Sequence, residues 1–301
     1  MSLKILLRLV AWFPHAIDHR VPGASPRRTW LRARSVALET YPRDFVARVE
    51  PESFDFAGNT RYVIQRAIYL HGVWEPDITA WVRQFLRPGG LAVDIGANTG
   101  YYALLFSRLV GPMGTVVCFE PVPSIFGQLE ANLRRNAATN VEPVRAALGE
   151  HNGTIEVFRA ATDNIGNSST QWEQGHTSEG EAPMRVGDEV LASRAAEVSL
   201  VKIDTEGDEM TVLSGMRGVV EAMPPGAAVL VEVTPDKLRL RGRAGADVWD
   251  FFGEHGWDAF RIRNDYDFAS YAERTAAALE PLAELPDGRC DLVFVKPGRA
   301  G

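Results

Sequence analysis

The sequence predicts an α/β fold built around a largely parallel sheet. The first observation is an apolar run, Leu91–Ile95, which ends at a glycine turn and is followed at once by a helical apolar pattern. The second is the alternation of short β-branched runs with helical segments along the rest of the chain. The third is composition, because 46% of the 301 residues are hydrophobic and 24% are charged, as in a well-packed globular protein.

Residues 1–75 precede the glycine turn, and we expect them to form an N-terminal extension ahead of a main domain at residues 76–297. The extension should contain one helix, a Pro/Arg-rich stretch at Val21–Arg34, and a β-hairpin from Ala47 to Ile68 that turns at Gly58-Asn59. Lys4–Ile17 is amphipathic, but it is too short and too interrupted to be a transmembrane segment. A cap or an arm of a homo-oligomer is the interpretation we favour for this region.

The remaining elements follow in chain order. Pro143 falls in the third strand, and since proline cannot donate to a ladder, we expect that strand at a sheet edge. The last two strands should form an antiparallel closing pair, and Gln171–Glu181 is typical of a polar loop. Helices are expected at Glu75–Leu86 and Asp247–His255, and strands at residues 91–95, 114–119, 141–146, 198–203, 227–231, 258–262 and 291–295.

The turn after the first strand carries the clearest functional signal. Its pattern is Asp-x-Gly-x-x-x-Gly, from Asp94 through Gly96 to Gly100. Glycines permit positive φ and close approach of a ligand, and the helix N-terminus beside them offers free N–H groups. Dinucleotide-binding folds instead carry G-x-G-x-x-G, without a carboxylate that would repel a pyrophosphate. A ligand with a cationic ammonium and neutral hydroxyls, such as S-adenosylmethionine, suits this turn better.

An acid at the end of the second strand supports a nucleoside ligand. Glu120 follows the strand at residues 114–119, twenty positions after Gly100. In nucleotide-binding α/β units an acid at this place takes the ribose hydroxyls. A solvated strand-end glutamate is the alternative interpretation, and the glycine turn makes the ribose role the better one.

Several motifs together resemble the FkbM family of methyltransferases. The segment Leu200–Gly215 contains Lys-Ile-Asp-Thr-Glu-Gly at 202–207, similar to the family pattern K-I-D-x-E-G-x-E-x-x-V-L-x-G. Gly72-Val-Trp-Glu-Pro76, the turn at 93–102 and Phe119-Glu-Pro121 agree with it, so that the resemblance covers about residues 60–296. It implies a class I, Rossmann-like methyltransferase sheet of seven strands in the order 3-2-1-4-5-7-6. It also implies O-methylation of a hydroxyl on a sugar, natural product or other small molecule.

The same resemblance implies which residues contact the cofactor. The turn should wrap its methionine part, Glu120 and Pro121 should lie at the ribose, and Ala147 should border the adenine. Glu75 either lies where backbone meets the cofactor or is an ordinary first-turn helix acid. The turn residues concerned are Asp94, Gly96, Ala97, Asn98, Thr99 and Gly100.

Candidates for chemistry at the methyl acceptor are acids at the carboxyl edge of the sheet. Asp204 and Glu232 end the fourth and fifth strands, and Glu206 should point into the same crevice. An alcohol, with a pKa of roughly 16, must lose its proton to a base as the bond forms, or be made more acidic by a divalent metal such as Mg²⁺. We favour a metal-independent base, Glu206 first and Asp204 second, over the alternative that both brace the loop. His71 is a weaker candidate, and no zinc pattern occurs.

Composition limits the remaining function classes. The net charge of −7 gives no reason to expect nucleic acid, and the basic clusters at residues 27–34 and 237–243 are most simply solvated surface, the second also fitting a phosphate- or lipid-bearing substrate. Cys118 and Cys290 are not expected to form a disulfide, which fits the cytoplasm. An S-adenosylmethionine-dependent O-methyltransferase is the leading hypothesis. An NAD(P)-linked oxidoreductase and a non-catalytic binding protein with the same fold are the alternatives.

Overall fold

An eight-stranded sheet forms the centre of the structure, a computed structural model that describes residues 3–13, 24–160, 166, 168–264, 271 and 278–298. The strand order is β12-β11-β13-β10-β9-β3-β4-β5. Neighbours from β10 to β5 run parallel, whereas β13, β11 and β12 join antiparallel. The strands are β3 (Leu91–Ile95), β4 (Thr115–Phe119), β5 (Val141–Val144), β9 (Val198–Ile203), β10 (Ala228–Val233), β11 (Asp258–Ile262), β12 (Glu280–Pro281) and β13 (Cys290–Val295).

The strand count corrects the expectation of seven. The additional strand, β12, is two residues long and lies outside β11. At the other edge lies β5 with Pro143, as the missing N–H of proline requires, so this expectation is confirmed. The antiparallel pairing of β11 with β13 confirms the closing pair.

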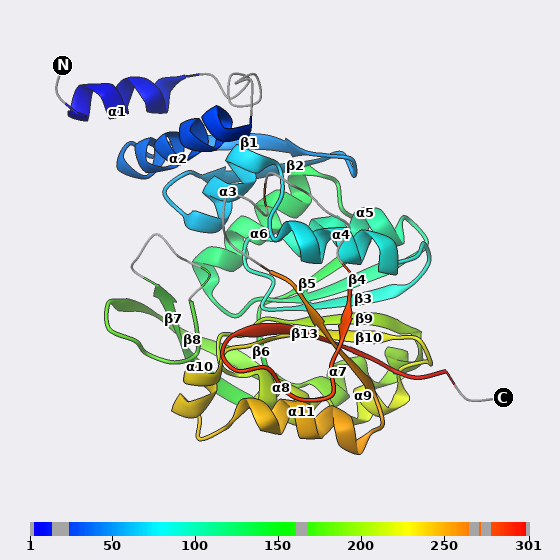
Figure 1. The fold of residues 1–301 in the computed structure, drawn as a ribbon. Coiled ribbons are helices and arrows are strands. Elements are labelled where there is room, and N and C mark those ends of the chain that lie inside the picture. Colours follow the sequence, from blue (N-terminus) through cyan, green and yellow to red (C-terminus); the bar gives the residue numbers. More distant parts are fainter. Residues whose placement is uncertain are drawn as a thin grey trace.

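Helices cover both faces of the sheet, because successive side chains in each strand point to opposite sides. Ala92 and Val116 pack among helices on one face, and Val93 and Val117 pack among helices on the other. Figure 1 shows these two layers above and below the sheet. The first layer contains α4 (Pro76–Phe85), α5 (Tyr101–Val110) and α6 (Pro123–Arg135), and the second contains α8 (Glu209–Gly215), α9 (Arg217–Ala222) and α11 (Gly245–Glu254).

The N-terminal region differs from the expectation of one helix and a hairpin at Ala47–Ile68. It contains α1 (Leu3–Trp12), α2 (Ala24–Thr40), α3 (Val63–His71) and a hairpin of β1 (Asp44–Val49) and β2 (Phe54–Asn59). The chain turns at residues 50–53, so Gly58-Asn59 ends β2 rather than making the turn. The β-branched Val63 and Ile64 favoured a strand, but α3 buries Ile68 in the core of the main domain and Leu70 against α1 and α2, and this packing on two sides decides for a helix.

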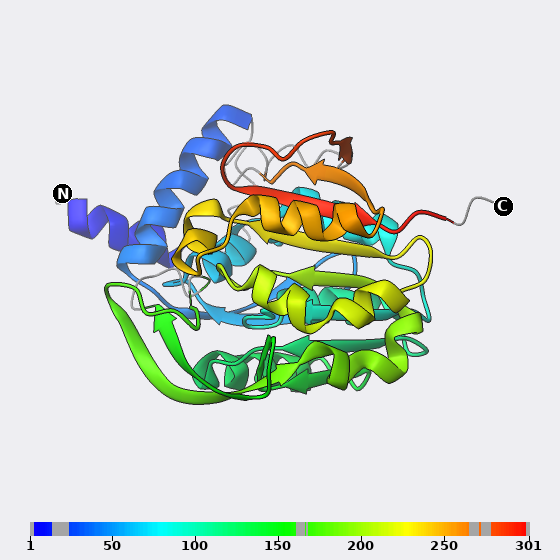
Figure 2. The ribbon, with the colours of Figure 1, turned by 90° about the horizontal axis from the view of Figure 1, so that it is seen from below.

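A second, three-stranded sheet lies between β5 and β9 in the sequence and projects at one side of the molecule (Figure 2). Its order is β6 (Ala147–Gly149), β8 (His176–Val186) and β7 (Gly153–Ala160). The polar loop expected at Gln171–Glu181 is therefore wrong from His176 onward, where the chain pairs with β7. The polar residues of β8 fit a strand because most of its side chains face solvent.

Further short helical segments lie between the strands. Between β8 and β9 these are α7 (Gly187–Leu191) and a 3₁₀ helix at Ala192–Glu197, and after β10 it is α10 (Pro235–Leu240). Cys118 and Cys290 are both buried and free, as expected. No helix among the described residues is long and apolar enough to cross a membrane.

Candidate functional site

The glycine turn joins β3 to α5 in a conformation that only a few residue types adopt. Gly96 and Gly100 have φ of 85° and 91°, and Asn98 between them has φ of 50°. The N–H groups of Gly96 and Ala97 donate to the Phe119 carbonyl at 3.0 and 2.9 Å. A Cβ on Gly96 would lie 1.9 Å from the Asp204 carbonyl oxygen. The turn therefore packs directly against the end of β9, which leaves no room for a side chain.

Glu120 connects this turn to the end of β4. Its carboxylate accepts the N–H of Asn98 at 3.0 Å and the N–H of Val122 at 2.9 Å. The side chain is buried, and burial raises the pKa of Glu120 to about 7, although both hydrogen bonds oppose this. Each carboxylate oxygen keeps a further lone pair, so Glu120 can hold the turn and still accept hydrogen bonds from a ligand.

Asp94 is a buried carboxylate whose oxygens have no hydrogen-bond donor in the part of the chain that the structure describes. Neither of its oxygens accepts a hydrogen bond from a described residue, and the residue is only 1% exposed. Burial raises the pKa of Asp94 to about 7, with the nearby Lys202 acting in the opposite direction. Leaving a buried carboxylate unsatisfied is costly, so this atom pair points to a ligand with N–H or O–H donors.

Three further acids, Asp204, Glu206 and Glu232, meet at the carboxyl ends of β9 and β10. One oxygen of each lies within 4.8 Å of the others. Glu232 does not follow β10 as expected but lies inside it, opposite Asp291 of β13. The prediction that these acids share one crevice agrees with this geometry.

Each acid has its own cationic partner. The Lys202 ammonium donates to Asp204 at 2.7 Å, and Lys237 lies 3.1 Å from Glu206. Glu232 pairs with Arg289. Each carboxyl of the cluster therefore has a cation within ion-pair distance.

The three carboxyls have different proton affinities. Burial alone would raise the pKa of Asp204, but Lys202 and a hydrogen bond from Glu232 hold it below its ordinary value. Burial, and then repulsion from Asp204, raises the pKa of Glu206, against the opposing charge of Lys237. Burial together with Asp204 and Asp291 raises the pKa of Glu232 well above its ordinary value. Within the pair, Glu232 therefore holds a proton more strongly than Asp204 does and donates the hydrogen bond between them.

A neighbouring acid braces the loop after β9. Glu209 accepts the N–H of Gly207 at 2.9 Å and the N–H of Thr205 at 3.3 Å, and it is 1% exposed. Asp204 and Glu206 both line a cavity instead. The bracing role considered for these two is carried by Glu209.

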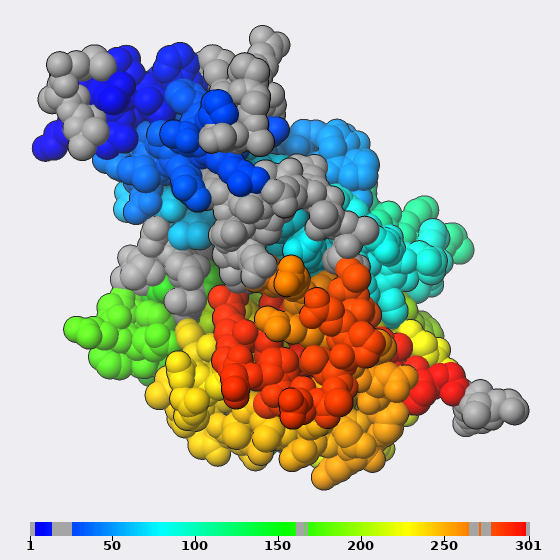
Figure 3. Space-filling view, in the orientation of Figure 1, coloured from blue at the N-terminus to red at the C-terminus, as the bar shows by residue number. Residues whose placement is uncertain are grey.

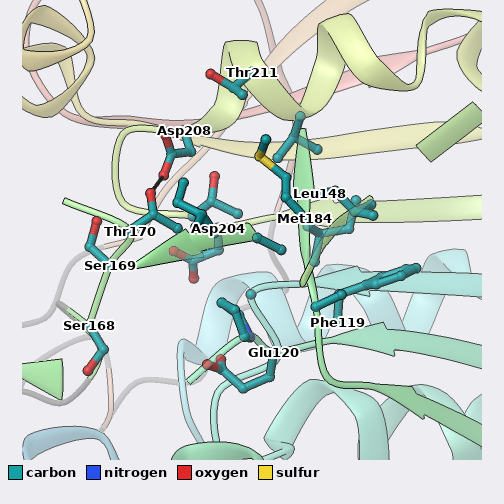
Figure 4. A pocket seen from close by; sticks show the side chains of 18 of the residues that line it. Phe119, Glu120, Leu148, Ser168, Ser169, Thr170, Met184, Asp204, Asp208 and Thr211 are labelled. Atoms are coloured by element: carbon teal, nitrogen blue, oxygen red, sulfur yellow. Dashed lines mark hydrogen bonds between the residues drawn. The ribbon is translucent and has the colours of Figure 1, made fainter. Parts of the chain in front are cut away.

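Two adjoining cavities open on this region and share Gly96, Asn98, Gly166 and Asp204 in their walls. The smaller, which we call the nucleoside cavity, has a volume of about 60 Å³ and apolar walls that include Phe119 and Leu148. Figure 4 shows Glu120 at its lower side and Met184 beside Leu148. The larger, which we call the transfer cavity, has a volume of about 390 Å³ and is lined by Asp94 and the three acids.

The cavities bring together most of the residues expected from the sequence. Gly100 is not among the lining residues, because it packs against Leu129. His71 is not among them either, and its ring lies 4.5 Å from that of Tyr271. The expected residues that do line a cavity are Glu75, Asp94, Gly96, Ala97, Asn98, Thr99, Glu120, Pro121, Ala147, Asp204, Glu206 and Glu232.

Glu75 has an unusual backbone and a buried side chain. Its φ of 44° is left-handed, and its side chain does not cap α4. Instead, its carboxylate accepts a hydrogen bond from the Tyr102 hydroxyl at 2.7 Å and one from Asn264 at 3.1 Å. The alternative of an ordinary first-turn helix acid does not describe this arrangement.

Sequence reasoning missed several residues of the transfer cavity. Lys202, Lys237 and Arg289 supply its cations, and Lys237 belongs to a cluster interpreted as solvated surface. A lysine inside the otherwise apolar strand β9 was the one available signal. The apolar wall of the cavity comes from the N-terminal region, through Val63, Ile64 and Trp74.

Comparison with known proteins bears on this site. A family model described as the methyltransferase FkbM domain matches residues 94–258. The hexuronic acid methyltransferase AglP of Haloferax volcanii is 26% identical over 197 residues, covering 65% of this chain and 77% of that protein. The 31-O-demethyl-FK506 methyltransferase FkbM of Streptomyces tacrolimicus is 30% identical over 161 residues, 44% of this chain and 61% of that protein. A crystal structure of an S-adenosylmethionine-dependent O-methyltransferase from Thermotoga maritima has 12% identity and a TM-score of 0.41, covering 85% of this chain and 79% of that one.

Proposed function

Because this chain belongs to the FkbM methyltransferase family, we propose that it transfers a methyl group from S-adenosylmethionine to a hydroxyl of a sugar or another small molecule. The observation that carries the proposal is the unsatisfied buried Asp94 beside the glycine turn, in a cavity that also holds three acids. We regard β12 as an addition to the seven-stranded sheet of such enzymes.

The chain's residues fit this cofactor in two places. In the transfer cavity, Asp94 would accept from the ammonium of the methionine part, close to the turn backbone. In the nucleoside cavity, Glu120 would accept from the ribose hydroxyls, and Phe119 and Leu148 would enclose the adenine with Ala147. The bound cofactor supplies an electrophilic methyl group on a sulfonium.

Glu206 is our first choice for the base, followed by Asp204. As the acceptor oxygen bonds to the methyl carbon, the carbon–sulfur bond breaks and the hydroxyl proton passes to the carboxylate. The raised pKa of Glu206 makes it the stronger proton acceptor of the two, and the ion pair with Lys237 favours its ionised form. Glu232 would orient Asp204 by donating a hydrogen bond to it.

The N-terminal region would contribute to acceptor binding, as an extension of the catalytic domain at residues 76–297. Val63, Ile64 and Trp74 give the transfer cavity an apolar wall beside the acids. A sugar ring or polyketide offers both an apolar face and hydroxyls, which suits a cavity of this kind. AglP is named for a hexuronic acid, which is a sugar, and FkbM is named for 31-O-demethyl-FK506.

We do not propose a metal-assisted step. Asp204, Glu206 and Glu232 are close enough for Mg²⁺, but Lys202, Lys237 and Arg289 already lie beside them, and these positive charges would oppose a further cation. A chelator should leave turnover unchanged. A loss of activity that returns with Mg²⁺ would contradict this assignment.

Binding is the first test of the proposal. Calorimetry should show binding of S-adenosylhomocysteine and none of NADH, and Asp94→Asn should weaken the former. Incubation with methyl-labelled S-adenosylmethionine and a panel of sugars and polyketides should then transfer label to a hydroxyl. Binding of NADH alone would favour an oxidoreductase, and binding of neither would favour a non-catalytic protein.

A further inference from the structure

Helix α1 presents an apolar face to solvent. Eleven large hydrophobic residues are exposed among the described residues, and five of them fall within residues 5–13. These five residues, which we call the α1 face, are Ile5 (53% exposed), Leu6 (44%), Leu9 (51%), Trp12 (73%) and Phe13 (41%). The α1 face is therefore a concentration of exposed apolar side chains and not the usual scatter of single ones.

The α1 face is not simply the outside of a poorly packed helix. At 3.6 residues per turn, Ile5, Leu9 and Trp12 share one stripe, with Leu6 and Phe13 next to it. The opposite side of the helix, through Leu7, Val10 and Ala11, packs on Leu31 and Leu38 of α2 and on α3. Figure 1 shows α1 as the outermost element, with α2 between it and the main domain.

Basic side chains border the α1 face. Lys4 and Arg8 are exposed and fall on the flank next to Ile5 and Trp12. On α2, Arg27 and Arg32 are exposed as well. In the space-filling view the two helices form one corner of the molecule (Figure 3).

The charge of this corner is opposite to that of the rest of the chain. Residues 1–38 contain seven lysines or arginines and one acidic residue, Asp18, whereas the whole chain has 32 basic and 39 acidic residues. A second copy docked face to face would bring Lys4 and Arg8 near their own symmetry mates, which disfavours a symmetric dimer here. A binding surface with negative charges and an apolar layer just beneath them would match both the basic residues and the apolar side chains of the α1 face.

We propose that the α1 face is a binding site for an anionic lipid bilayer, with Trp12 and its apolar neighbours in the headgroup region and the basic residues on the phosphates. A short amphipathic helix with a cationic flank lies in the interface in this way without spanning the membrane. The proposal does not depend on the methyl-transfer assignment. It would hold the enzyme at a membrane surface by its α2–α3 side, and α3 also supplies Val63 and Ile64 to the transfer cavity.

Cosedimentation with sucrose-loaded vesicles tests this, using the full chain. The protein should pellet with phosphatidylcholine–phosphatidylglycerol vesicles in a two-to-one ratio and bind phosphatidylcholine alone about tenfold more weakly, because the cations contribute to binding. Leu9→Asp and Arg8→Glu should each lower binding to the anionic vesicles by about tenfold. Trp12→Phe should remove the quenching of tryptophan fluorescence by brominated lipid.

Matched variants separate the α1 face from general surface effects. Met113 is 87% exposed and lies outside this corner, so Met113→Asp should bind vesicles like the parent chain. Arg185→Glu, at an exposed position of β8, controls for Arg8→Glu. All variants should bind S-adenosylhomocysteine as the parent does, which shows that they are folded.

Two results would overturn the proposal. One is failure of the parent chain to pellet with the anionic vesicles, or pelleting that Leu9→Asp leaves unchanged. The other is a dimer in analytical ultracentrifugation that Leu9→Asp dissociates, since the α1 face would then belong to a second copy. A parent chain that binds S-adenosylhomocysteine but does not bind the anionic vesicles would refute this site alone and leave the proposed function standing.

Discussion

The proton affinities of the acids in the transfer cavity depend on cations from different parts of the chain. Lys202 lies two residues before its partner Asp204, whereas Lys237 reaches Glu206 from α10, and Arg289 reaches Glu232 from just before β13. Because Lys202 also acts on Asp94, and Arg289 also acts on Asp204 and Glu206, removing a single cation should change several of these proton affinities together.

Glu206→Gln tests the base directly. The amide keeps the size of the side chain but cannot take the hydroxyl proton, so turnover should fall roughly 10²–10⁴-fold. The affinity for S-adenosylhomocysteine should stay the same. Steady-state kinetics with labelled cofactor and calorimetry give the two quantities.

Glu173→Gln is the matched control. Glu173 also accepts a hydrogen bond from Lys237, at 2.9 Å, yet it is not among the residues that line the transfer cavity. This variant should retain most of its turnover. Equal losses in both variants would mean that Glu206 acts only by holding Lys237.

Asp94 predicts a pH-dependent affinity for S-adenosylhomocysteine. Its pKa is raised to about 7 by burial, so below this value most molecules carry a proton there and cannot pair with the ligand ammonium. The affinity should therefore rise with pH and level off above about 7, changing by up to about tenfold per unit on the acid side. Calorimetry in two buffers of different ionisation enthalpy should also detect proton release on binding near pH 6.

The raised pKa of Asp94 also makes the stability of the ligand-free protein depend on pH. A carboxyl with a raised pKa destabilises the ligand-free protein when it ionises, so this contribution to stability is full below the ordinary value and lost as pH rises to about 7. Asp94→Asn should lessen both pH effects, with the remaining slope of the affinity coming from Glu120, whose pKa is also about 7. An unchanged affinity profile in Asp94→Asn would exclude Asp94 from ligand binding.

At the scale of elements, the turn between β3 and α5 depends on its glycines. Gly96→Ala places a Cβ 1.9 Å from the Asp204 carbonyl at a positive φ, so it should lower the free energy of unfolding by about 3 kcal/mol or more. Gly127 lies in the middle of α6 with no atom near its would-be Cβ. Gly127→Ala should therefore stabilise the protein by about 0.5–1 kcal/mol. Urea denaturation measures both, and a stable Gly96→Ala protein would show that the turn can move away from β9.

The elements that the sequence predicted best are those with a single dominant signal. The strands β3, β9 and β11 have the expected bounds, because each is a short run with apolar residues and a clear end. The hairpin at Ala47–Ile68 was wrong because β-branched residues at the start of α3 resemble a strand. His176 and its neighbours were assigned to a loop since most side chains of β8 face solvent and give no apolar alternation.

At the scale of the whole molecule, the acids of the site could be predicted but not their partners. Asp94 lies near the end of a strand and Glu120, Asp204 and Glu206 follow strands closely, and parallel strands bring their carboxyl ends to one edge. Arg289 and Trp74 reach the same cavity from opposite ends of the chain. Only the assembled fold brings them together, and no local pattern in the sequence indicates it.

The last prediction concerns the N-terminal region, where α1 packs mainly on α2 but β2 and α3 pack into the core of the main domain. Residues 1–23 include α1, which packs mainly on α2, so a chain without them should fold and bind S-adenosylhomocysteine like the full chain. A chain without residues 1–75 loses Phe54 and Phe56, fully buried among α5 and the sheet, and the wall at Val63 and Trp74. Removing these large core side chains exposes the apolar surface they cover, so that chain should be insoluble or lack a cooperative unfolding transition. Circular dichroism and calorimetry distinguish the two cases. A soluble, ligand-binding chain from residue 76 onward would show that the extension is an independent unit rather than part of the same core.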